Sequence, residues 1–173
     1  LATQGEYGGI RQVYRAGIGE ILKDLKKAQV VHFDLGIGDP VTPGPRQMEM
    51  PTLLSKNEDI SWSVYPVETI IAEKLHALIT HGNINSRSKD VHDLSVFLPT
   101  ANAKILAEAL KRCFAFRKTE WPESFSASIK NIDTKTLERG WLSAIASVSE
   151  APQFKSAFAS VVKHMADLER SFP

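Results

Sequence analysis

The sequence has 173 residues, which is enough for one domain with a buried core or for two small, closely packed domains. Its formal net charge of +1 excludes a global electrostatic attraction for nucleic acid, so any such contact must come from a local patch. The single cysteine, Cys113, excludes an internal disulfide and indicates a reducing cytoplasm, and the lack of a long apolar run excludes a membrane-spanning helix.

Residues 6–37 are predicted to form a strand, a helix and a second strand. The first strand, over 6–16, mixes apolar and polar residues after two glycines. The helix over 17–27 carries apolar residues at helical spacing and ends in two lysines, which favour a helix C-terminus. The second strand, over 30–37, is rich in β-branched and aromatic residues.

Residues 38–65 are predicted to form turns and short strands. The stretch GDPVTPGP, at 38–45, contains three prolines and two glycines, which favour an extended, kinked path. Short strands are expected at 46–54 and 60–65, with a turn at 56–59. They are expected to extend the sheet, because two strands alone would be marginally stable in water.

Residues 65–94 are predicted to form a helix, a short polar loop and a second helix. In the first helix an apolar stripe recurs at helical spacing, and Lys74 lies inside that stripe. A lysine on a buried face needs an anion, because an unpaired buried charge is costly. The second helix places Asp90 and Asp93 on one side. These faces predict either a functional site or an internal ion pair.

The C-terminal part of the chain changes to three amphipathic helices, and Asn102 and Asp133 are the expected N-caps of the first two. Helices after a mixed beginning predict an α+β fold, in which a small mixed or antiparallel sheet is followed by a C-terminal helical bundle. The sheet part, with one helix, is expected over 1–65 and the helical domain over 66–173.

Two residues are candidates for chemistry within these elements. A strand interior seldom holds a carboxylate, so Asp34 is either directed into a cleft, where it could bind Mg²⁺, or faces solvent while Phe33 and Leu35 face the core. Lys74 could bind phosphate, donate a proton or form half of a structural salt bridge. The residues alone leave these alternatives open.

The start of the second helix in this pair is a third candidate. Arg87 and Lys89 supply cationic donors near a helix N-terminus, an environment that favours anions. Plain capping, with Ser88 as the cap, would explain Asp90, because a carboxylate complements the helix dipole there. Capping does not explain Asp93, which lies one turn further into the helix.

The run from Lys111 to Trp121 mixes cations with aromatic side chains and is compatible with a contact to RNA. More often such a run is a helix end whose aromatic residues are core and whose cations complement the helix dipole. The histidines show no pair at zinc-ligand spacing with a third partner, so no zinc site is predicted.

Four blocks of the sequence resemble one protein family. In order they are FDLGIGDPVTPGP, YPVETIIAEKLHALI, NSRSKDVHDL and RCFAFRKTEWP, and together they cover roughly residues 6–122. They are similar to the nucleotidyltransferase toxins of the AbiEii/AbiGii abortive-infection type, in the DNA polymerase β-like superfamily. The resemblance implies that 1–65 belong to a nucleotidyltransferase core. It also implies Mg²⁺-dependent transfer of a nucleoside monophosphate from an NTP to an acceptor, expected to be RNA and in particular tRNA.

The resemblance also implies roles for individual residues. Asp34 matches a carboxylate that completes the metal site of the family. Lys74 and Asp93 match residues expected to be catalytic, with the lysine offsetting charge on the phosphates. The residues expected to bind the substrate are Arg87, Lys89 and Asp90.

One departure from the family pattern limits what this chain is expected to do. The Gly-Ser turn and the Asp-x-Asp pair that precede the position of Asp34 in the superfamily are missing. The chain therefore resembles the C-terminal portion of such a toxin, and we expect the full-length parent to be active and this chain alone to be inactive. The alternative is a non-catalytic module that keeps the fold and binds nucleotide, RNA or protein. The expected partners are an NTP, an RNA acceptor and a cognate antitoxin in a bacterial cytoplasm, without a membrane.

Overall fold

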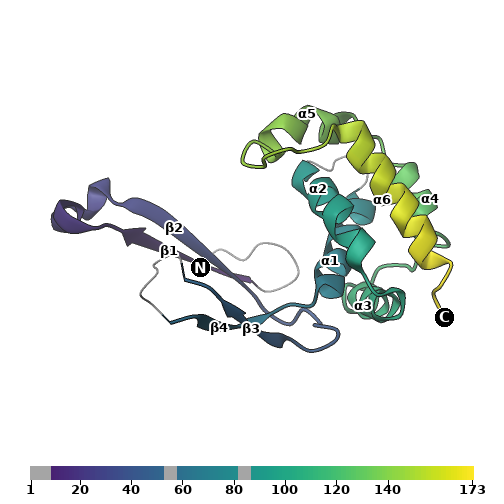
Figure 1. The fold of residues 1–173 in the computed structure, drawn as a ribbon, viewed down its shortest axis with the longest axis horizontal. Helices are drawn as coiled ribbons and strands as arrows, with labels where there is room; N and C mark the ends of the chain where they lie inside the picture. Colours follow the sequence, from purple (N-terminus) through teal and green to yellow (C-terminus); the bar gives the residue numbers. More distant parts are fainter. Residues whose placement is uncertain (1–8, 53–57, 82–86) are drawn as a thin grey trace. The chain divides into compact units, whose positions relative to one another are not determined.

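A computed structural model describes residues 9–52, 58–81 and 87–173. The chain divides into an N-terminal unit, residues 1–39, and a C-terminal unit, residues 40–173. The strands are β1 (Gly9–Ala16), β2 (Gln29–Gly36), β3 (Arg46–Met50) and β4 (Ile60–Val64). The helices are α1 (Val67–His81), α2 (Ser88–Phe97), α3 (Ala103–Phe116), α4 (Phe125–Lys130), α5 (Lys135–Ala144) and α6 (Phe154–Glu169). Antiparallel strands followed by helices confirm the predicted α+β class (Figure 1).

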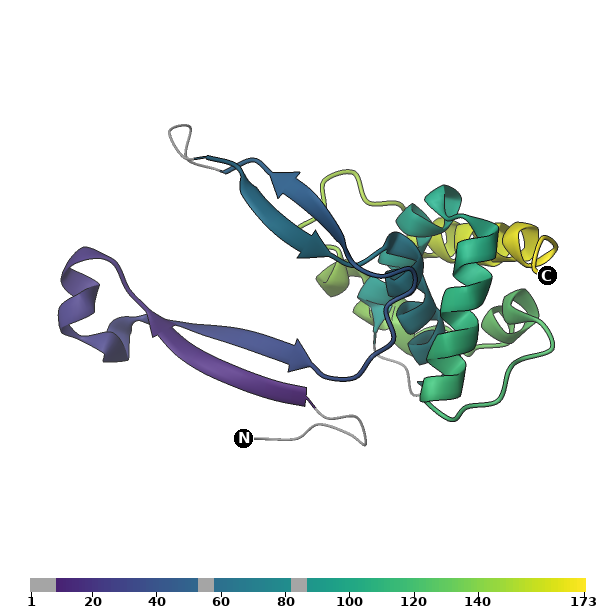
Figure 2. The same ribbon diagram turned by 90° about the horizontal axis from the view of Figure 1, so that it is seen from below.

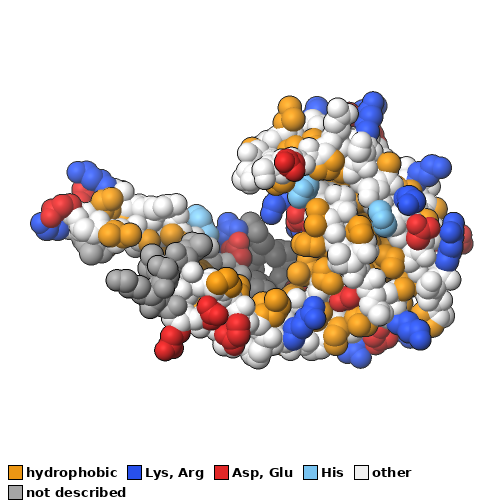
Figure 3. Space-filling view, viewed as in Figure 1, with side chains coloured by type: hydrophobic (Ala, Val, Ile, Leu, Met, Phe, Trp, Pro, Cys, Tyr) orange, Lys and Arg blue, Asp and Glu red, His pale blue; other side chains and the backbone are white. Residues whose placement is uncertain are grey.

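The N-terminal unit is a hairpin in which β1 and β2 pair antiparallel, with Val13 opposite His32. The predicted strands at 6–16 and 30–37 are thus confirmed over the described residues. Alternation along both strands gathers apolar residues on one face, namely Ile10, Tyr14, Val31, Phe33 and Leu35. This face is open to solvent, since the Phe33 side chain is 54% exposed, and Figure 3 shows hydrophobic side chains on the hairpin surface.

The helix predicted over 17–27 is wrong in type. The structure has two short 3-10 helices there, at Gly19–Lys23 and Leu25–Lys27. Asp24 separates them, and its side chain accepts a hydrogen bond from the Lys26 backbone nitrogen at 3.2 Å, a local bond that competes with a continuous helix. Ile18, Ile21 and Leu25 are exposed, so these residues supply no packed face that would stabilise an α-helix.

The C-terminal unit begins at Pro40, within the turn predicted at 38–45, and Thr42 attaches this segment to α1. The Thr69 hydroxyl accepts a hydrogen bond from the Thr42 nitrogen and donates one to the Thr42 carbonyl oxygen, both at 2.9 Å. The β3–β4 hairpin follows, with Met48 opposite Trp62. It confirms the two short strands predicted at 46–54 and 60–65, within narrower bounds.

Residues 56–57 of the turn predicted at 56–59 lie outside the described residues. The sheet prediction needs a correction, because we expected these strands to extend one sheet. In the described part of the chain they form two two-stranded sheets, β1–β2 and β3–β4, and Figure 2 draws each pair as antiparallel arrows. The β3–β4 hairpin also has an exposed apolar face, made by Met48, Met50, Ile60 and Trp62. Within the described residues, each hairpin therefore presents an exposed apolar face, as in an amphipathic sheet fragment.

The core of the protein lies among the helices. α1 packs on α3, and α2 contacts α1, α5 and α6 (Figure 1). Side chains that are almost completely buried come from every helix of this group and include Leu75, Leu94, Leu110, Ile129, Leu137 and Val161. Each such side chain contributes about 1.5–3 kcal/mol by leaving water. The predicted cap at Asn102 is confirmed, since its Oδ1 accepts hydrogen bonds from the next backbone nitrogens, those of Lys104 and Ile105.

Two details of the helical part differ from prediction. α4 was not expected, because six residues are too few for an apolar period to be recognised. Ser124 caps this helix by accepting a hydrogen bond from the Ala127 nitrogen at 3.1 Å. Asp133 is not the N-cap of α5; Thr134 takes that position, while the Asp133 carboxylate accepts a hydrogen bond from the Lys135 nitrogen at 3.1 Å.

Gly140 allows α5 to approach the start of α2. The buried Ser88 hydroxyl donates a hydrogen bond to the Leu137 carbonyl oxygen at 2.8 Å, and a Cβ added at Gly140 would lie 2.6 Å from that hydroxyl oxygen. We expect Gly140→Ala to lower the free energy of unfolding by about 1–2 kcal/mol, although alanine is the better helix former. In a Ser88→Ala background the same change should be neutral or stabilising. Urea unfolding of the unchanged chain, the two single variants and the double variant measures the coupling between Gly140 and Ser88. An equal loss of stability from Gly140→Ala in both backgrounds would contradict this coupling.

Candidate functional site

Lys74 connects α1 with α2. Its Nζ lies 2.7 Å from Asp90 Oδ1 and 2.8 Å from Asp93 Oδ2. The contact is largely shielded from water, because the side chains of Lys74, Asp90 and Asp93 are 19%, 6% and 17% exposed. The structure thus brings together the three charged residues that the helical periodicity placed on inward faces. We call this group the Lys74 cluster.

The sequence positions the Lys74 cluster through two helical spacings. Lys74 directly precedes Leu75, which is fully buried. The first part of the Lys74 side chain therefore lies at the edge of the core. Asp90 and Asp93 are three residues apart and therefore lie on one face of α2. Val91 and Leu94, both fully buried, hold that helix against the core beside them. The carboxylates consequently meet the lysine where two packed helices touch.

Electrostatic interactions stabilise the charged forms in the Lys74 cluster. Burial would lower the pKa of Lys74, but hydrogen bonds to Asp90 and Asp93 outweigh it, and the pKa is raised. Burial would raise the pKa of Asp93, but its hydrogen bond with Lys74 and the charges of Lys74 and Lys89 lower it. A charged ammonium group on Lys74 and a charged carboxylate on Asp93 at neutral pH follow from these two directions.

Arg87 and Lys89 flank the Lys74 cluster at the start of α2. Arg87 Nε lies 2.8 Å from Asp90 Oδ2, and the side chain is more than half exposed. Lys89 is exposed on the helix surface. The alternative of plain capping by Ser88 is not found, because Arg87 occupies the N-cap position and the Ser88 hydroxyl donates a hydrogen bond to α5. Two cations therefore stand at the water-facing side of the cluster.

Asp34 belongs to the N-terminal unit, where it pairs with Arg11 on the neighbouring strand. Both carboxylate oxygens are used, with Arg11 Nε at 2.6 Å and the terminal guanidinium nitrogen at 2.8 Å. The hydrogen bond from Arg11 lowers the pKa of Asp34. Asp34 faces solvent on the side of the strand opposite Phe33 and Leu35, but those two residues are exposed as well and do not form a core.

The donor groups of the described residues do not fit a Mg²⁺ site by themselves. Within residues 9–52, 58–81 and 87–173, no three His, Cys, Asp or Glu side chains gather so that they could hold a metal ion. Asp34 is engaged by a guanidinium, and Asp90 and Asp93 are engaged by an ammonium. Mg²⁺ prefers six oxygen ligands, so a complete site needs donors in addition to these.

His92 is a neighbour of the Lys74 cluster that sequence reasoning did not identify. Its Nδ1 lies 3.5 Å from Asp93 Oδ1, and its ring centroid lies 6.2 Å from that of Trp141 on α5. Adjacent residues on a helix normally point in different directions, so no periodic pattern connects His92 with Asp93. Only the packing of α5 on α2 reveals the contact.

His76, on α1, is buried without charge. Its ring packs edge-on against Phe114, and burial, together with the charges of Arg117 and His81, lowers its pKa to about 4. An unfolded chain protonates this residue near pH 6.5. The folded state therefore binds fewer protons below that pH, and we expect stability to fall by about 3 kcal/mol between pH 7 and pH 4. In thermal unfolding, His76→Gln should lose this decrease in stability with falling pH, whereas the exposed control His32→Gln should keep it. A His76→Gln protein whose stability falls with pH as steeply as that of the unchanged chain would contradict the lowered pKa of His76.

Comparison of the sequence with models of known protein families identifies the class of protein to which this chain belongs. The model described as nucleotidyl transferase AbiEii toxin, type IV TA system, matches residues 1–164. The chain therefore belongs to this family, which confirms the resemblance of its four blocks. Comparison with curated proteins and with solved structures gives no match. In the described part of the chain, no helix is long and apolar enough to cross a membrane.

Proposed function

We propose that this chain belongs to a nucleotidyl transferase that moves a nucleoside monophosphate from an NTP to RNA, with tRNA as the acceptor. The observation that carries the proposal is the Lys74 cluster, in which one shielded ammonium contacts two carboxylates at 2.7 and 2.8 Å. Membership of the AbiEii family supports a nucleotide substrate and a cognate antitoxin. The same membership and the single cysteine support a cytoplasmic location.

The electrostatics of Lys74 favour a phosphate-binding role over proton donation. An ammonium group has three donors, and two are directed to Asp90 and Asp93, which leaves one to offer to a phosphate oxygen. The raised pKa keeps the group charged at neutral pH. Such a fixed positive charge offsets the negative charge that develops on the leaving pyrophosphate. Arg87 and Lys89 can add donors from the exposed side of the cluster.

Mg²⁺ is the proposed cofactor of the complete enzyme, where it would neutralise phosphate charge. In this chain Asp34 is the proposed ligand, and the remaining carboxylates must come from elsewhere, because the chain contains no Gly-Ser turn followed by Asp-x-Asp. The uncovered apolar faces of both hairpins support a core that another segment completes. We therefore propose that the 173-residue chain is inactive alone.

The test uses the full-length parent with labelled NTPs, Mg²⁺ and total tRNA. Lys89→Ala should slow label transfer by about tenfold or more, because it removes a phosphate contact without removing a buried group. Lys155→Ala is the matched control, since Lys155 is also an exposed lysine at the second residue of its helix, α6. It should transfer at the unchanged rate.

Three results would count against the proposal. No label transfer by the parent would contradict the enzymatic role, and NTP binding without transfer would favour the alternative of a non-catalytic binding module. Equal rates for Lys89→Ala and Lys155→Ala would remove Lys89 from the substrate site. Transfer by the 173-residue chain alone would contradict its proposed inactivity.

A further inference from the structure

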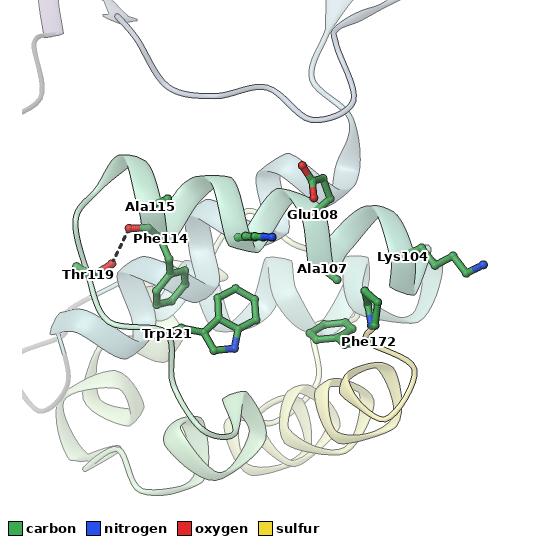
Figure 4. Close-up of a pocket in the computed structure, with 10 residues that line it drawn as sticks. Lys104, Ala107, Glu108, Phe114, Ala115, Thr119, Trp121 and Phe172 are labelled. Carbon is green, nitrogen blue, oxygen red and sulfur yellow. Dashed lines mark hydrogen bonds between the residues drawn. The ribbon is translucent and has the colours of Figure 1, made fainter.

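A pocket on the exposed face of α3 takes no part in the Lys74 cluster. It has a volume of about 540 Å³, which lies in the usual range for small-ligand sites. Helical spacing places Lys104, Ala107, Glu108 and Lys111 along one side of it. Figure 4 shows Phe114, Trp121 and Phe172 next to this helix face. The pocket therefore combines an aromatic wall with a charged rim.

The aromatic wall offers one exposed ring with rigid support. The Trp121 side chain is 48% exposed, although tryptophan is usually well buried. Its ring contacts two buried rings edge to face, with centroids 5.9 Å from Phe114 and 4.9 Å from Phe125. These contacts hold the indole in place and leave part of its surface open for stacking.

The loop that carries Trp121 is itself fixed. Backbone nitrogens of Lys118 and Thr119 donate to carbonyl oxygens of Ala115 and Phe114 at 3.1 Å, which closes the end of α3. Lys118 adopts the left-handed conformation of such a helix end, with a φ of 52°. The Thr119 hydroxyl lies 2.9 Å from His76 Nε2, which attaches the loop to α1. The pocket is therefore formed before any ligand binds.

The rim of the pocket favours an anion. Lys104 and Lys111 are exposed and lie seven residues apart on α3, two turns along the same face. The Glu108 carboxylate also lines the pocket, but Arg112 Nε lies 2.7 Å from it and offsets its charge. Two positive charges of α3 thus remain beside an aromatic surface.

We propose that this pocket binds single-stranded RNA, with one unstacked base on Trp121 and neighbouring phosphates on Lys104 and Lys111. Aromatic stacking combined with lysines that follow the backbone is the general chemistry of single-strand binding. The inference rests on the proposed function in one respect, because the RNA is taken to be the acceptor. It adds a contact for that acceptor on residues outside the Lys74 cluster, and it assigns a role to the mixed basic and aromatic run of the sequence.

The test measures binding of the 173-residue chain to a labelled, unstructured RNA of roughly ten nucleotides, a length suited to such sites. Trp121→Leu keeps an apolar side chain against Phe125 and should weaken binding about tenfold without changing the salt dependence. The double variant Lys104→Ala/Lys111→Ala should reduce the slope of log K against log salt by about 1.4, since each phosphate contact on a single strand contributes about 0.7.

A matched pair of exposed lysines, Lys130 and Lys163, lines another partly apolar hollow and serves as control. Lys130→Ala/Lys163→Ala should leave the affinity and the slope unchanged. An equal loss of RNA affinity in the two double variants would show non-specific attraction and overturn the proposal. An unchanged RNA affinity of Trp121→Leu would also overturn it. Loss of a dimer instead of RNA binding in Trp121→Leu would assign the pocket to a second copy of the chain.

The same variants in the full-length parent separate this inference from the proposed function. Lys104→Ala/Lys111→Ala is compared with the unchanged parent at limiting tRNA. An unchanged rate of transfer would overturn RNA binding by the pocket, while the enzymatic role would stand. RNA binding that depends on Trp121, together with no transfer by the parent, would support the pocket and overturn the enzymatic role.

Discussion

Replacing Lys74 by alanine is expected to lower the free energy of unfolding by at least about 3 kcal/mol, because two shielded carboxylates lose their shared cation. In a chain of this size, that loss corresponds to a decrease in Tm of roughly 6–12 °C. Arg87 still contacts Asp90 in the variant, so the charge left without a partner is chiefly that of Asp93. Thermal unfolding followed by circular dichroism measures the change.

The control for this prediction is Arg112→Ala. Arg112 Nε lies 2.7 Å from Glu108, the same distance as Lys74 from Asp90, but both partners are about half exposed. An exposed pair contributes at most about 1 kcal/mol, so this variant should unfold close to the unchanged temperature. Adding Asp93→Asn to Lys74→Ala should restore part of the stability. If Lys74→Ala were as stable as Arg112→Ala, the cluster would not be an electrostatically coupled unit.

Replacing Glu169 by alanine is expected to cost about 2–3 kcal/mol, because one carboxylate at the end of α6 accepts four hydrogen bonds from the start of α4. Its donors are the hydroxyls of Ser124 and Ser126 and the backbone nitrogens of Phe125 and Ser126. Burial would raise the pKa of Glu169, but these bonds outweigh it and lower the pKa. Chemical denaturation at pH 7 measures the loss.

The lowered pKa fixes how this contribution depends on pH. The folded carboxylate stays charged at a pH where the unfolded one is protonated, so its stabilisation is present above about pH 4.3 and disappears as the pH falls through the folded pKa. Glu108→Ala is the control, since it removes an exposed carboxylate paired only along one helix. Equal losses in Glu169→Ala and Glu108→Ala would contradict the attachment of α4 to α6.

The helical part of the fold was largely predictable from sequence because its stabilising pattern is local. Spacing alone predicts that Lys74, Asp90 and Asp93 lie on inward faces, and in the structure Lys74 Nζ lies 2.7 Å from Asp90 and 2.8 Å from Asp93. Asn102 was recognised as a cap because its side chain bonds to backbone only two and three residues away. Short-range geometry therefore predicts the contact between α1 and α2, whereas its role as a substrate site stays a prediction.

Features that depend on tertiary packing were not predictable. Residues 17–27 have a helical pattern but no packed face, so the α-helix does not form. Asp34 pairs with Arg11 across a strand register that the sequence does not state. The pocket beside Trp121 requires α3 and the segment after α6 to meet, although these are about fifty residues apart in the chain. Each of these three features depends on whether distant segments of the chain come into contact.

Label transfer from NTP to tRNA by the full-length parent carrying Asp93→Asn is the most direct test of the Lys74 cluster as a catalytic site. Asparagine keeps the shape and one acceptor for Lys74, but it removes the charge that helps to orient the ammonium. We predict a folded protein that transfers label about a hundredfold more slowly. A folded Asp93→Asn protein with the unchanged rate would contradict the account and leave Lys74 and Asp93 as a structural ion pair.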